Sequence, residues 1–467
     1  MKELGSYIFT RTELEWFAGA SGDFNPIHVD PVSARRLITG MQTVHGMYTM
    51  LFALDLYYKE HAHIPKQIKV FFQKPVLEGE EVKFFFKKDC TETRIILRNN
   101  YGQVASILLI GYGITVSKLI PNKRPYKKSI KNNSFYRIKG QFGTLSVMAA
   151  QEDLERSFSN VSRMLGAHSV ATIMSFSRLV GMSMPGLHSI FTGLNMKFGL
   201  QYTMPLSWKI TRHISTNVPI QITLEGQGIF AEIDAFVRPA PVKQATMQEV
   251  YRVIDANAFI GQRALVIGGS RGLGELVAKC VVAGGGNVCI TYANGKNDAL
   301  KIKKEMNDSG GICKTSMLNV TCLDGVEGLL SAFKPTHIYY FATSRIRNNN
   351  QNYNTDLYEE YLSIYVAAFS ELVRIASRCI SHPFYVFYPS TVFIENMPKG
   401  FSEYANAKKE GEYQCKFLEA ENLNLNIYVK RLPIIRTDQT SFLTQVEAKS
   451  ALEEMRNVLI EMKGLVR

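Results

Sequence analysis

The chain has 467 residues, of which 46% are hydrophobic and 20% are charged. This balance is typical of a globular protein and excludes a disordered chain, and the length predicts two or three domains. A formal net charge of +13 fits a globular protein with a basic surface, and the alternative is attraction to anionic ligands such as nucleotide phosphates, coenzyme A or an acidic carrier protein. The basic residues are dispersed and form no recognised DNA- or RNA-binding motif, so we expect no nucleic-acid partner.

Cysteine usage and hydropathy narrow the class further. The seven cysteines are scattered without a Cys-x-x-Cys pair, which predicts reduced thiols and neither a disulfide framework nor a metal site. The first residues lack the apolar core of a signal peptide, and no apolar stretch is long enough to cross a membrane. We therefore expect a cytoplasmic protein with no membrane span.

The first segment, residues 1–120, is predicted to be an α+β domain. An amphipathic helix (RTELEWFAGAS, 11–21) is followed by a polar loop and then by an apolar run without proline (44–58), which indicates a buried helix. The stretch from there to Val116 alternates polar and apolar residues between Gly and Asn-Asn turns, as antiparallel strands do. One buried helix wrapped by a bent antiparallel sheet is an α+β arrangement.

The polar loop SGDFNPIHVD carries the first candidate site. Asp23 and Asn25 before a proline fit ordinary turn and helix-cap chemistry. An alternative interpretation is catalytic, because the spacing of Asp23 and His28 lets a loop direct a carboxylate and an imidazole at one water. Gly46 in the later VHGM begins the predicted helix, where its amide N–H can stabilise an enolate oxygen. We interpret the neighbouring His45 as structural.

A second domain is predicted at residues 130–240, after a basic linker at 121–133. A helix of small and apolar residues (166–184) is followed by alternating strands. The order of helix and strands repeats that of the first domain without visible sequence similarity, which indicates a duplicated fold.

The third segment, residues 260–467, has the rhythm of a parallel α/β sheet. After a linker at 238–252, RALVIGGS, GELVAKCVVAGG and NVCITYA predict a strand, a helix and a strand. Between the first strand and the helix lies GGSRGLG, whose missing side chains let the backbone approach a pyrophosphate at a helix N-terminus. The candidate cofactor-binding residues of this loop are Gly268, Ser270, Arg271, Gly272, Leu273 and Gly274.

A candidate acid-base set follows in YPSTVFIENMPKGFSEYANAKKEGE. Tyr404 and Lys408 lie four residues apart and share one helix face. A nearby ammonium, together with a cationic nicotinamide, lowers the pKa of a phenol and prepares it to pass a proton. The hydroxyl of Ser390 can hold a carbonyl oxygen, and Thr391 is an alternative because the spacing fits either residue.

From about residue 261 onward the chain resembles the short-chain dehydrogenases/reductases, on GGSRGLG, on Ser390, Tyr404 and Lys408, and on KRLPIIRTD after them. The resemblance implies an α/β Rossmann domain that transfers a hydride between a nicotinamide cofactor and a carbonyl or alcohol. It implies that Tyr404 is the acid/base, that Lys408 binds the ribose and tunes Tyr404, and that Ser390 orients the substrate oxygen.

Three positions depart from that family's pattern. The Asn-Asn-Ala-Gly turn is Phe341–Ser344, and the relay asparagine aligns with Tyr365. The usual Asp-Val near the adenine is Asn319-Val320, which we retain as candidate cofactor contacts. These changes make a slow or inactive reductase an alternative.

The residues around the predicted cofactor favour NADPH. The second strand ends in ITYANGK, with no acid to hold a ribose diol. Arg271 in the glycine loop and Lys296 beyond the strand can instead meet a 2′-phosphate. NADH is the alternative cofactor.

SGDFNPIHVDP, VHGM and KVFFQKPVLEGEEV resemble the MaoC-like (R)-specific enoyl-CoA hydratases of the hot-dog fold, over about the first 115 residues. The resemblance implies that Asp23 and His28 are the catalytic pair and that Asn25 supports the loop. Because hot-dog domains often pair, we expect a double hot-dog N-terminal part and a homo-oligomer, with the second half shaping an acyl tunnel. A second active site is the alternative, and its polar candidates are Arg178, Ser183, His188 and Ser189.

The two activities that these resemblances imply share one compound, a 3-hydroxyacyl thioester. We therefore expect a multidomain, bifunctional enzyme that reduces a 3-oxoacyl thioester and dehydrates the product to the trans-2-enoyl form, or runs both steps in reverse. Coenzyme A or an acyl carrier protein is the expected handle. The alternatives are a reductase for an unrelated carbonyl, such as a nucleotide sugar, and an acyl-thioester-binding scaffold with a degenerate reductase.

Overall fold

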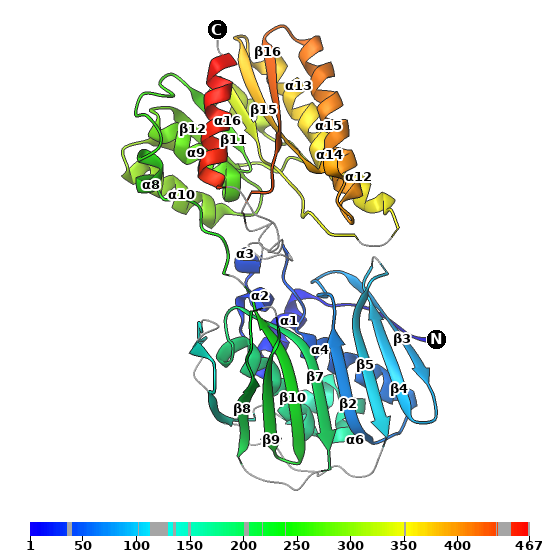
Figure 1. The fold of residues 1–467 in the computed structure, drawn as a ribbon. Coiled ribbons are helices and arrows are strands. Elements are labelled where there is room, and N and C mark those ends of the chain that lie inside the picture. The colour runs from blue at the N-terminus through cyan, green and yellow to red at the C-terminus, as the bar shows by residue number, and fades with distance from the viewer. Residues whose placement is uncertain are drawn as a thin grey trace. The chain divides into compact units, whose positions relative to one another are not determined.

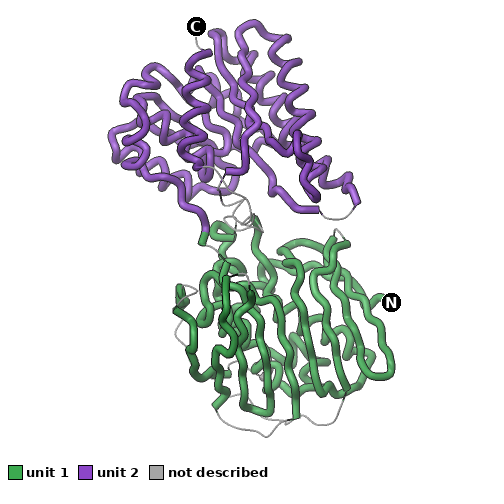
Figure 2. The backbone as a smooth tube through the Cα atoms, in the orientation of Figure 1, with its two compact units in different colours: residues 1–240 green, residues 241–467 purple. Residues whose placement is uncertain are grey.

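The computed structural model describes residues 1–34, 40–100, 102–112, 129–133, 137–147, 151–199, 205–216, 218–238, 240–349, 352–435, 437 and 450–465. The chain divides into two compact units, Met1–Ala240 and Pro241–Arg467 (Figures 1 and 2). Each unit has its own sheet and its own hydrophobic core. The predicted linker between the first two domains falls largely in 113–128, outside the described residues.

The first unit is built around one ten-stranded antiparallel sheet. Its strands are β1 (Lys2–Ile8), β2 (Pro65–Phe72), β3 (Glu81–Lys88), β4 (Glu92–Arg98), β5 (Val104–Tyr112), β6 (Phe142–Leu145), β7 (Ser189–Phe198), β8 (Leu206–Arg212), β9 (Ile220–Gly226) and β10 (Ile229–Val237). Its helices are α1 (Arg11–Ser21), α2 (Pro26–Val29), α3 (Pro31–Ala34), α4 (Gly46–Glu60), α5 (Gln151–Ser157), α6 (Ser159–Leu165) and α7 (Ala167–Arg178), which runs into a π-helical turn, η2 (Leu179–Ser183).

The strand order shows that this sheet consists of two matching halves. The order is β1-β3-β4-β5-β2-β7-β10-β9-β8-β6, so each half has the same sequence of strands read inward from its own edge. The halves join where β2 pairs antiparallel with β7, from Gln67 opposite Lys197 to Phe71 opposite Gly193. The predicted repeat of helix and strands is therefore present, and both copies share one continuous sheet and one core.

Two buried helices lie on the same face of the sheet, one from each half (Figure 1). The predicted helix at 44–58 is α4, and nine of its residues are buried. The predicted helix at 166–184 becomes α7 and η2, and the side chains of α7 from His168 to Arg178 are all buried. Apolar side chains around most of a helix's circumference indicate burial on all sides, which is what both sequences predict. The helix predicted at 11–21 is confirmed as α1.

The second unit has a six-stranded parallel sheet with the order β13-β12-β11-β14-β15-β16. The strands are β11 (Arg263–Ile267), β12 (Asn287–Tyr292), β13 (Ile312–Met317), β14 (His337–Tyr340), β15 (Phe384–Thr391) and β16 (Leu425–Leu432). The helices are α8 (Met247–Tyr251), α9 (Gly272–Ala283), α10 (Lys296–Asp308), α11 (Val326–Phe333), α12 (Thr355–Leu362), the π-helical turn η3 (Ser363–Ala368), α13 (Phe369–Cys379), α14 (Phe393–Asn396), α15 (Ser402–Glu421) and α16 (Ala451–Leu465).

The candidate residues of the second unit lie at the carboxyl ends of its central strands. The chain reverses its direction of winding between β11 and β14, and in such sheets ligands bind outside the carboxyl ends of the strands at that point. The glycine loop follows β11, the turn Phe341–Ser344 follows β14, and Ser390 and Thr391 end β15. Helices cover both faces, with α9 and α16 contributing to one core and α11 and α13 to the other. Among the helices of the described residues, none has the length and apolarity that a membrane crossing requires.

Candidate active sites

The first site is the loop between α1 and α2. α1 ends at Gly22, whose φ of 80° is in the left-handed region that favours glycine and turns the chain. Asn25 then caps α2 by accepting a hydrogen bond from the Ile27 amide, and Pro26 occupies the first helical position. The motif thus folds by ordinary cap chemistry, but Asp23 and Asn25 are 2% and 1% exposed. A turn on the protein surface is therefore excluded.

The second half of the unit holds the Asp23 carboxylate in place. Ser177 Oγ in α7 donates a hydrogen bond of 2.7 Å to Asp23 Oδ2, and the Asn25 amide donates one of 3.2 Å to Oδ1. Gly181 in η2 lies so close that a Cβ atom on it would be 2.2 Å from Asp23 Oδ1. The Asn25 side chain in turn donates to the carbonyls of Gly181 and Leu187, at 2.9 and 3.3 Å.

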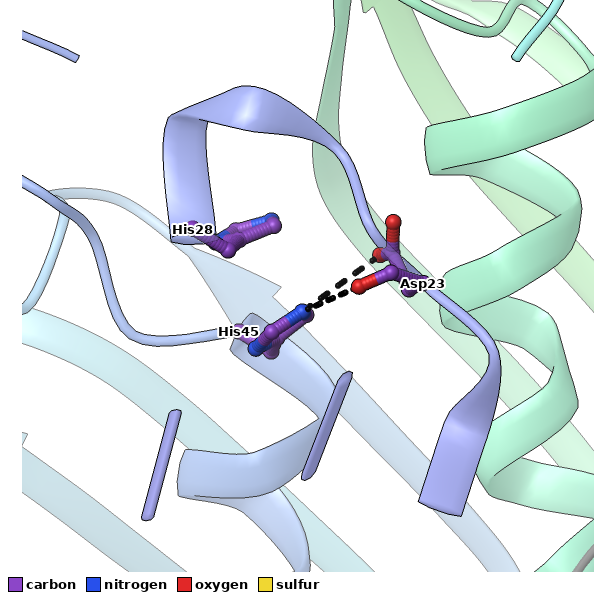
Figure 3. A group of neighbouring side chains, drawn as sticks. All are labelled: Asp23, His28 and His45. Carbon is purple, nitrogen blue, oxygen red and sulfur yellow. Dashed lines mark hydrogen bonds and ion pairs between the residues drawn. The ribbon is translucent and has the colours of Figure 1, made fainter. Parts of the chain in front are cut away.

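The imidazole of His28 lies beside this carboxylate (Figure 3). Its Nδ1–H donates to the Thr43 carbonyl over 2.7 Å, which assigns the proton to Nδ1 and leaves the lone pair on Nε2. The ring stacks on His45 with centroids 3.8 Å apart, and His45 Nε2–H donates to the Asp23 carbonyl over 3.0 Å. His45 thus supports both members of the pair from beneath, in keeping with its predicted structural role.

Burial sets the protonation states of these groups. Desolvation raises the pKa of Asp23 above its usual value, although His28 and the hydrogen bond from Ser177 oppose the shift. Desolvation lowers the pKa of His28, against the attraction of Asp23. Desolvation also lowers the pKa of His45 well below its usual value, and the neighbouring His28 adds to that shift. Near neutral pH both imidazoles are therefore uncharged, and the carboxylate is more basic than an exposed one.

The same three side chains offer possible metal-ligand atoms within 4.8 Å of one another. One nitrogen of each imidazole donates its proton to a carbonyl, which leaves the other nitrogen of each ring as the possible ligand atom. The arrangement also fits proton transfer by a carboxylate and a neutral imidazole.

The helix N-terminus beside this loop is that of α4. Gly46 is the first residue of the helix and follows the capping residue His45, which contacts Asp23. The first amides of a helix have no intrahelical acceptor, so they point outward as donors. A Cβ at Gly46 would lie 3.1 Å from the Phe72 ring, so a larger residue would push this helix end away.

The polar candidates of the second half lie in different places. Arg178 ends α7 and lies close enough to Asp23 to lower the pKa of its carboxyl group. Ser183 ends η2, where its carbonyl accepts from Asn133. His188 and Ser189 lie at the start of β7. The sequence analysis did not identify Ser177 and Gly181 as candidate site residues. The feature of the sequence that could have indicated them is the high frequency of small residues in α7 and η2.

The glycine loop of the second unit fits a dinucleotide. Three of its glycines pack against backbone or side chains: a Cβ on Gly268, Gly269 or Gly274 would lie 2.8 Å or less from its nearest neighbour. Gly272 has a φ of 61° and nothing within 4 Å of its Cβ position, and it begins α9, whose amides can meet a phosphate. Thr291 fixes the loop by bonding to the amides of Gly268 and Gly269.

The other predicted cofactor contacts lie around this loop. Ser270 is buried in the loop, Arg271 is the capping residue of α9, and Leu273 packs against the core. Lys296 begins α10 after the second strand. Asn319 lies after β13, where its side chain accepts from Thr321, and Val320 packs against the other core.

Tyr404 lies beside Thr391 rather than Ser390. A hydrogen bond from the Thr391 side chain lowers the pKa of Tyr404, but burial raises it more, so the phenol stays protonated. Ser390 donates to Glu412 at 2.5 Å, and Glu412 is ion-paired with Arg431. Adjacent strand residues point to opposite faces, so only one of the two hydroxyls can face the tyrosine. The geometry therefore places Thr391, the alternative to Ser390, beside Tyr404, whereas Ser390 contacts Glu412.

Lys408 lies in an aromatic environment. Its Nζ donates to the Pro389 carbonyl at 2.7 Å and lies 4.0 Å from the ring centroid of Tyr365 and 4.9 Å from that of Tyr388. Burial lowers the pKa of Lys408 to about 7. The Tyr365 hydroxyl is bonded to that of Thr343 at 2.6 Å, in the turn that departs from the family's pattern.

Comparisons with known proteins found one family match and several similar solved structures. Residues 5–100 match the family model described as a MaoC like domain. No curated protein matches the chain in sequence. Among solved structures, the chain is similar to a short-chain type dehydrogenase/reductase from Mycobacterium ulcerans, at 16% identity over 43% of this chain and 82% of that one, with a TM-score of 0.40.

Two further structures of this kind are similar over the same share of the chain. One is a short chain dehydrogenase from Burkholderia cenocepacia in complex with NADP, at 20% identity, 43% and 90% coverage and a TM-score of 0.40. The other is a short-chain dehydrogenase/reductase from Serratia marcescens, at 18% identity, 44% and 91% coverage and a TM-score of 0.41. The chain therefore has a MaoC-like domain at residues 5–100, as the Asp-x-Asn-Pro-x-His loop predicted, and its second unit has the strand order of a Rossmann fold.

Proposed function

We propose that this chain is a bifunctional acyl-thioester enzyme. Its first site adds water to a trans-2-enoyl thioester, or removes it from the (R)-3-hydroxyacyl form. Its second site interconverts the 3-hydroxyacyl and 3-oxoacyl thioesters with NADPH. The observation that carries the proposal is the pair of Asp23 and His28, a buried carboxylate with a raised pKa beside a neutral imidazole that has its lone pair on Nε2.

In the hydration direction, Asp23 and His28 share one water. The ionised Asp23 carboxylate accepts a proton as the water oxygen bonds to the β-carbon, while His28 Nε2 accepts a hydrogen bond from the same water and orients it. Asp23 then delivers that proton to the α-carbon, so H and OH are added in balance. Negative charge develops on the thioester oxygen in between, where the amide of Gly46 at the start of α4 can stabilise it. Dehydration follows the same path in reverse.

The two matching halves of the ten-stranded sheet support a double hot-dog arrangement for this unit. The second half contributes Ser177 and Gly181 to the position of Asp23 and has no Asp-x-Asn-Pro-x-His motif of its own. We therefore assign it a supporting role at the first site and the lining of an acyl tunnel, with coenzyme A or a carrier protein as the handle. Pairing of whole chains into a homo-oligomer is part of the same proposal.

For the second site, the glycine loop and α9 would hold the pyrophosphate, and Arg271 with Lys296 would favour the 2′-phosphate of NADPH over NADH. The bound nicotinamide supplies or accepts the hydride. Tyr404 would pass the proton to or from the substrate oxygen, and Thr391 would orient that oxygen, because its hydroxyl is the one beside Tyr404. Lys408 would keep Tyr404 in place and contact the ribose.

One substrate tests both assignments at once. With (R)-3-hydroxybutyryl-CoA and NADP⁺, the wild-type chain should form both the enoyl thioester absorbance and NADPH. Asp23→Asn should remove only the first signal and Tyr404→Phe only the second. If the wild type binds NADP⁺ and produces no NADPH from any 3-hydroxyacyl thioester, the reductase assignment is wrong, and the packing of Tyr365 against Lys408 then favours a cofactor-binding scaffold.

A further inference from the structure

Arg238 lies next to the first site, although it is 210 positions or more away from the loop in the sequence. It directly follows β10, and its amide donates to the His188 carbonyl over 2.8 Å. Its Nη2 donates to the Leu187 carbonyl over 3.2 Å. The same Leu187 carbonyl accepts from the Asn25 side chain over 3.3 Å. The guanidinium and the Asp-x-Asn-Pro-x-His loop are therefore neighbours that share one acceptor.

The charge of this arginine is not balanced within the unit as described. Burial alone lowers the pKa of Arg238 to about 10, and no carboxylate of the described residues acts on it. Its Nε is buried and, among those residues, has no hydrogen-bond partner; the same is true of His188 Nδ1. Arg238 as a whole is partly exposed, so its guanidinium is partly removed from water without a counterion, and an anionic partner at this place would be stabilised.

The neighbours of the guanidinium place it on the His28 side of the catalytic pair. Its charge lowers the pKa of both His28 and His188. The arginine whose charge lowers the pKa of Asp23 is Arg178 instead. An anion bound by Arg238 and His188 would therefore lie beside His28, within the reach of a short acyl group that reacts there.

We propose that Arg238 and His188 bind a carboxylate at the distal end of the acyl group, so that the first site acts on enoyl thioesters of dicarboxylic acids. The inference rests on the proposed function of this site. The phosphates of coenzyme A or of a carrier's prosthetic group are many bonds from the thioester, whereas a carboxylate on a short acyl chain lies only a few bonds from the reacting carbons. Arginine is suited to this role because its planar donors match a carboxylate.

The test compares crotonyl-CoA with glutaconyl-CoA, which differs by a carboxylate in place of a hydrogen on the terminal carbon. We expect the wild type to favour glutaconyl-CoA in kcat/KM by about 10- to 100-fold, the range of a charge-assisted hydrogen bond. Arg238→Gln should lose that preference, measured as the ratio of kcat/KM for the two substrates, and Arg238→Lys should keep part of it. Arg212→Gln is the matched control, because this arginine of the same half is paired with Asp234.

Two results would overturn the inference. One is a wild type that shows no preference for glutaconyl-CoA. The other is an equal loss on both substrates in Arg238→Gln and in His188→Asn, which would mean that these residues act on the enolate oxygen or on folding. Calorimetry with trans-glutaconate alone separates this inference from the proposed function. Glutaconate binding that requires Arg238, in a chain that hydrates neither thioester, would support the anion site and reject the hydratase.

Discussion

Gly181→Ala is the substitution that most sharply tests how the second half positions Asp23. The new Cβ would lie 2.2 Å from Asp23 Oδ1 and 2.7 Å from Oδ2 and Cγ. Real Cβ contacts are essentially never shorter than 3.0 Å, so the carboxylate or the turn η2 must move by about 0.8 Å. A displacement of about 1 Å from the productive geometry can cost about 100-fold in rate, or roughly 2.7 kcal/mol in the activation barrier.

The assay is the loss of enoyl thioester absorbance with crotonyl-CoA at saturating and at low substrate concentration. The matched control is Gly19→Ala in α1, a helical glycine with nothing within 4 Å of its Cβ position. We expect Gly19→Ala to keep wild-type hydration and Gly181→Ala to lose about 100-fold in kcat, with both variants folded. Full activity of Gly181→Ala would refute the claim that η2 fixes the position of Asp23.

Three further predictions concern single contacts. Ser177→Ala removes a hydrogen bond that lowers the pKa of Asp23, so the pKa of Asp23 should rise further. Because hydration needs the ionised carboxylate, the acid limb of the pH profile of kcat/KM should move to higher pH, and an unchanged acid limb would contradict this prediction. Thr391→Ala should reduce the rate of NADPH oxidation with acetoacetyl-CoA by about 100-fold, whereas Ser390→Ala should keep that rate within about 3-fold of the wild type. The opposite ranking would show that Ser390 supplies the orienting hydroxyl. Arg271→Ala should weaken NADPH binding by about 10-fold in a fluorescence titration and leave NADH binding unchanged, and an equal effect on both cofactors would reject the 2′-phosphate assignment.

The sequence predicted the elements whose structure is determined by residues close together in the chain. The Asp-x-Asn-Pro-x-His loop folds by capping within six residues, and the apolar run at 44–58 can only be buried. The glycine loop connects the strand before it to the helix after it, so the sequence pattern of strand, glycines and helix predicted its place at the carboxyl end of that strand. In each case the residues that determine the structure are neighbours in the chain.

The parts of the candidate sites that the sequence did not predict depend on contacts between segments far apart in the chain. Ser177 is 154 residues from Asp23, and nothing in its own surroundings distinguishes it from other small residues of a buried helix. The choice between Ser390 and Thr391 depends on which face of β15 the tyrosine packs against, and a one-residue difference reverses that face. Arg238 was part of a predicted linker, and only the folded sheet brings it to the loop.

The most direct test of the central claim is the rate of crotonyl-CoA hydration by the wild type and by Asp23→Asn. Asparagine keeps the size of the side chain and an acceptor for Ser177 but cannot accept a proton from water. The account predicts measurable hydration by the wild type and a loss of at least about 1,000-fold in Asp23→Asn, with an unchanged melting profile. Undiminished hydration by that variant would contradict the account.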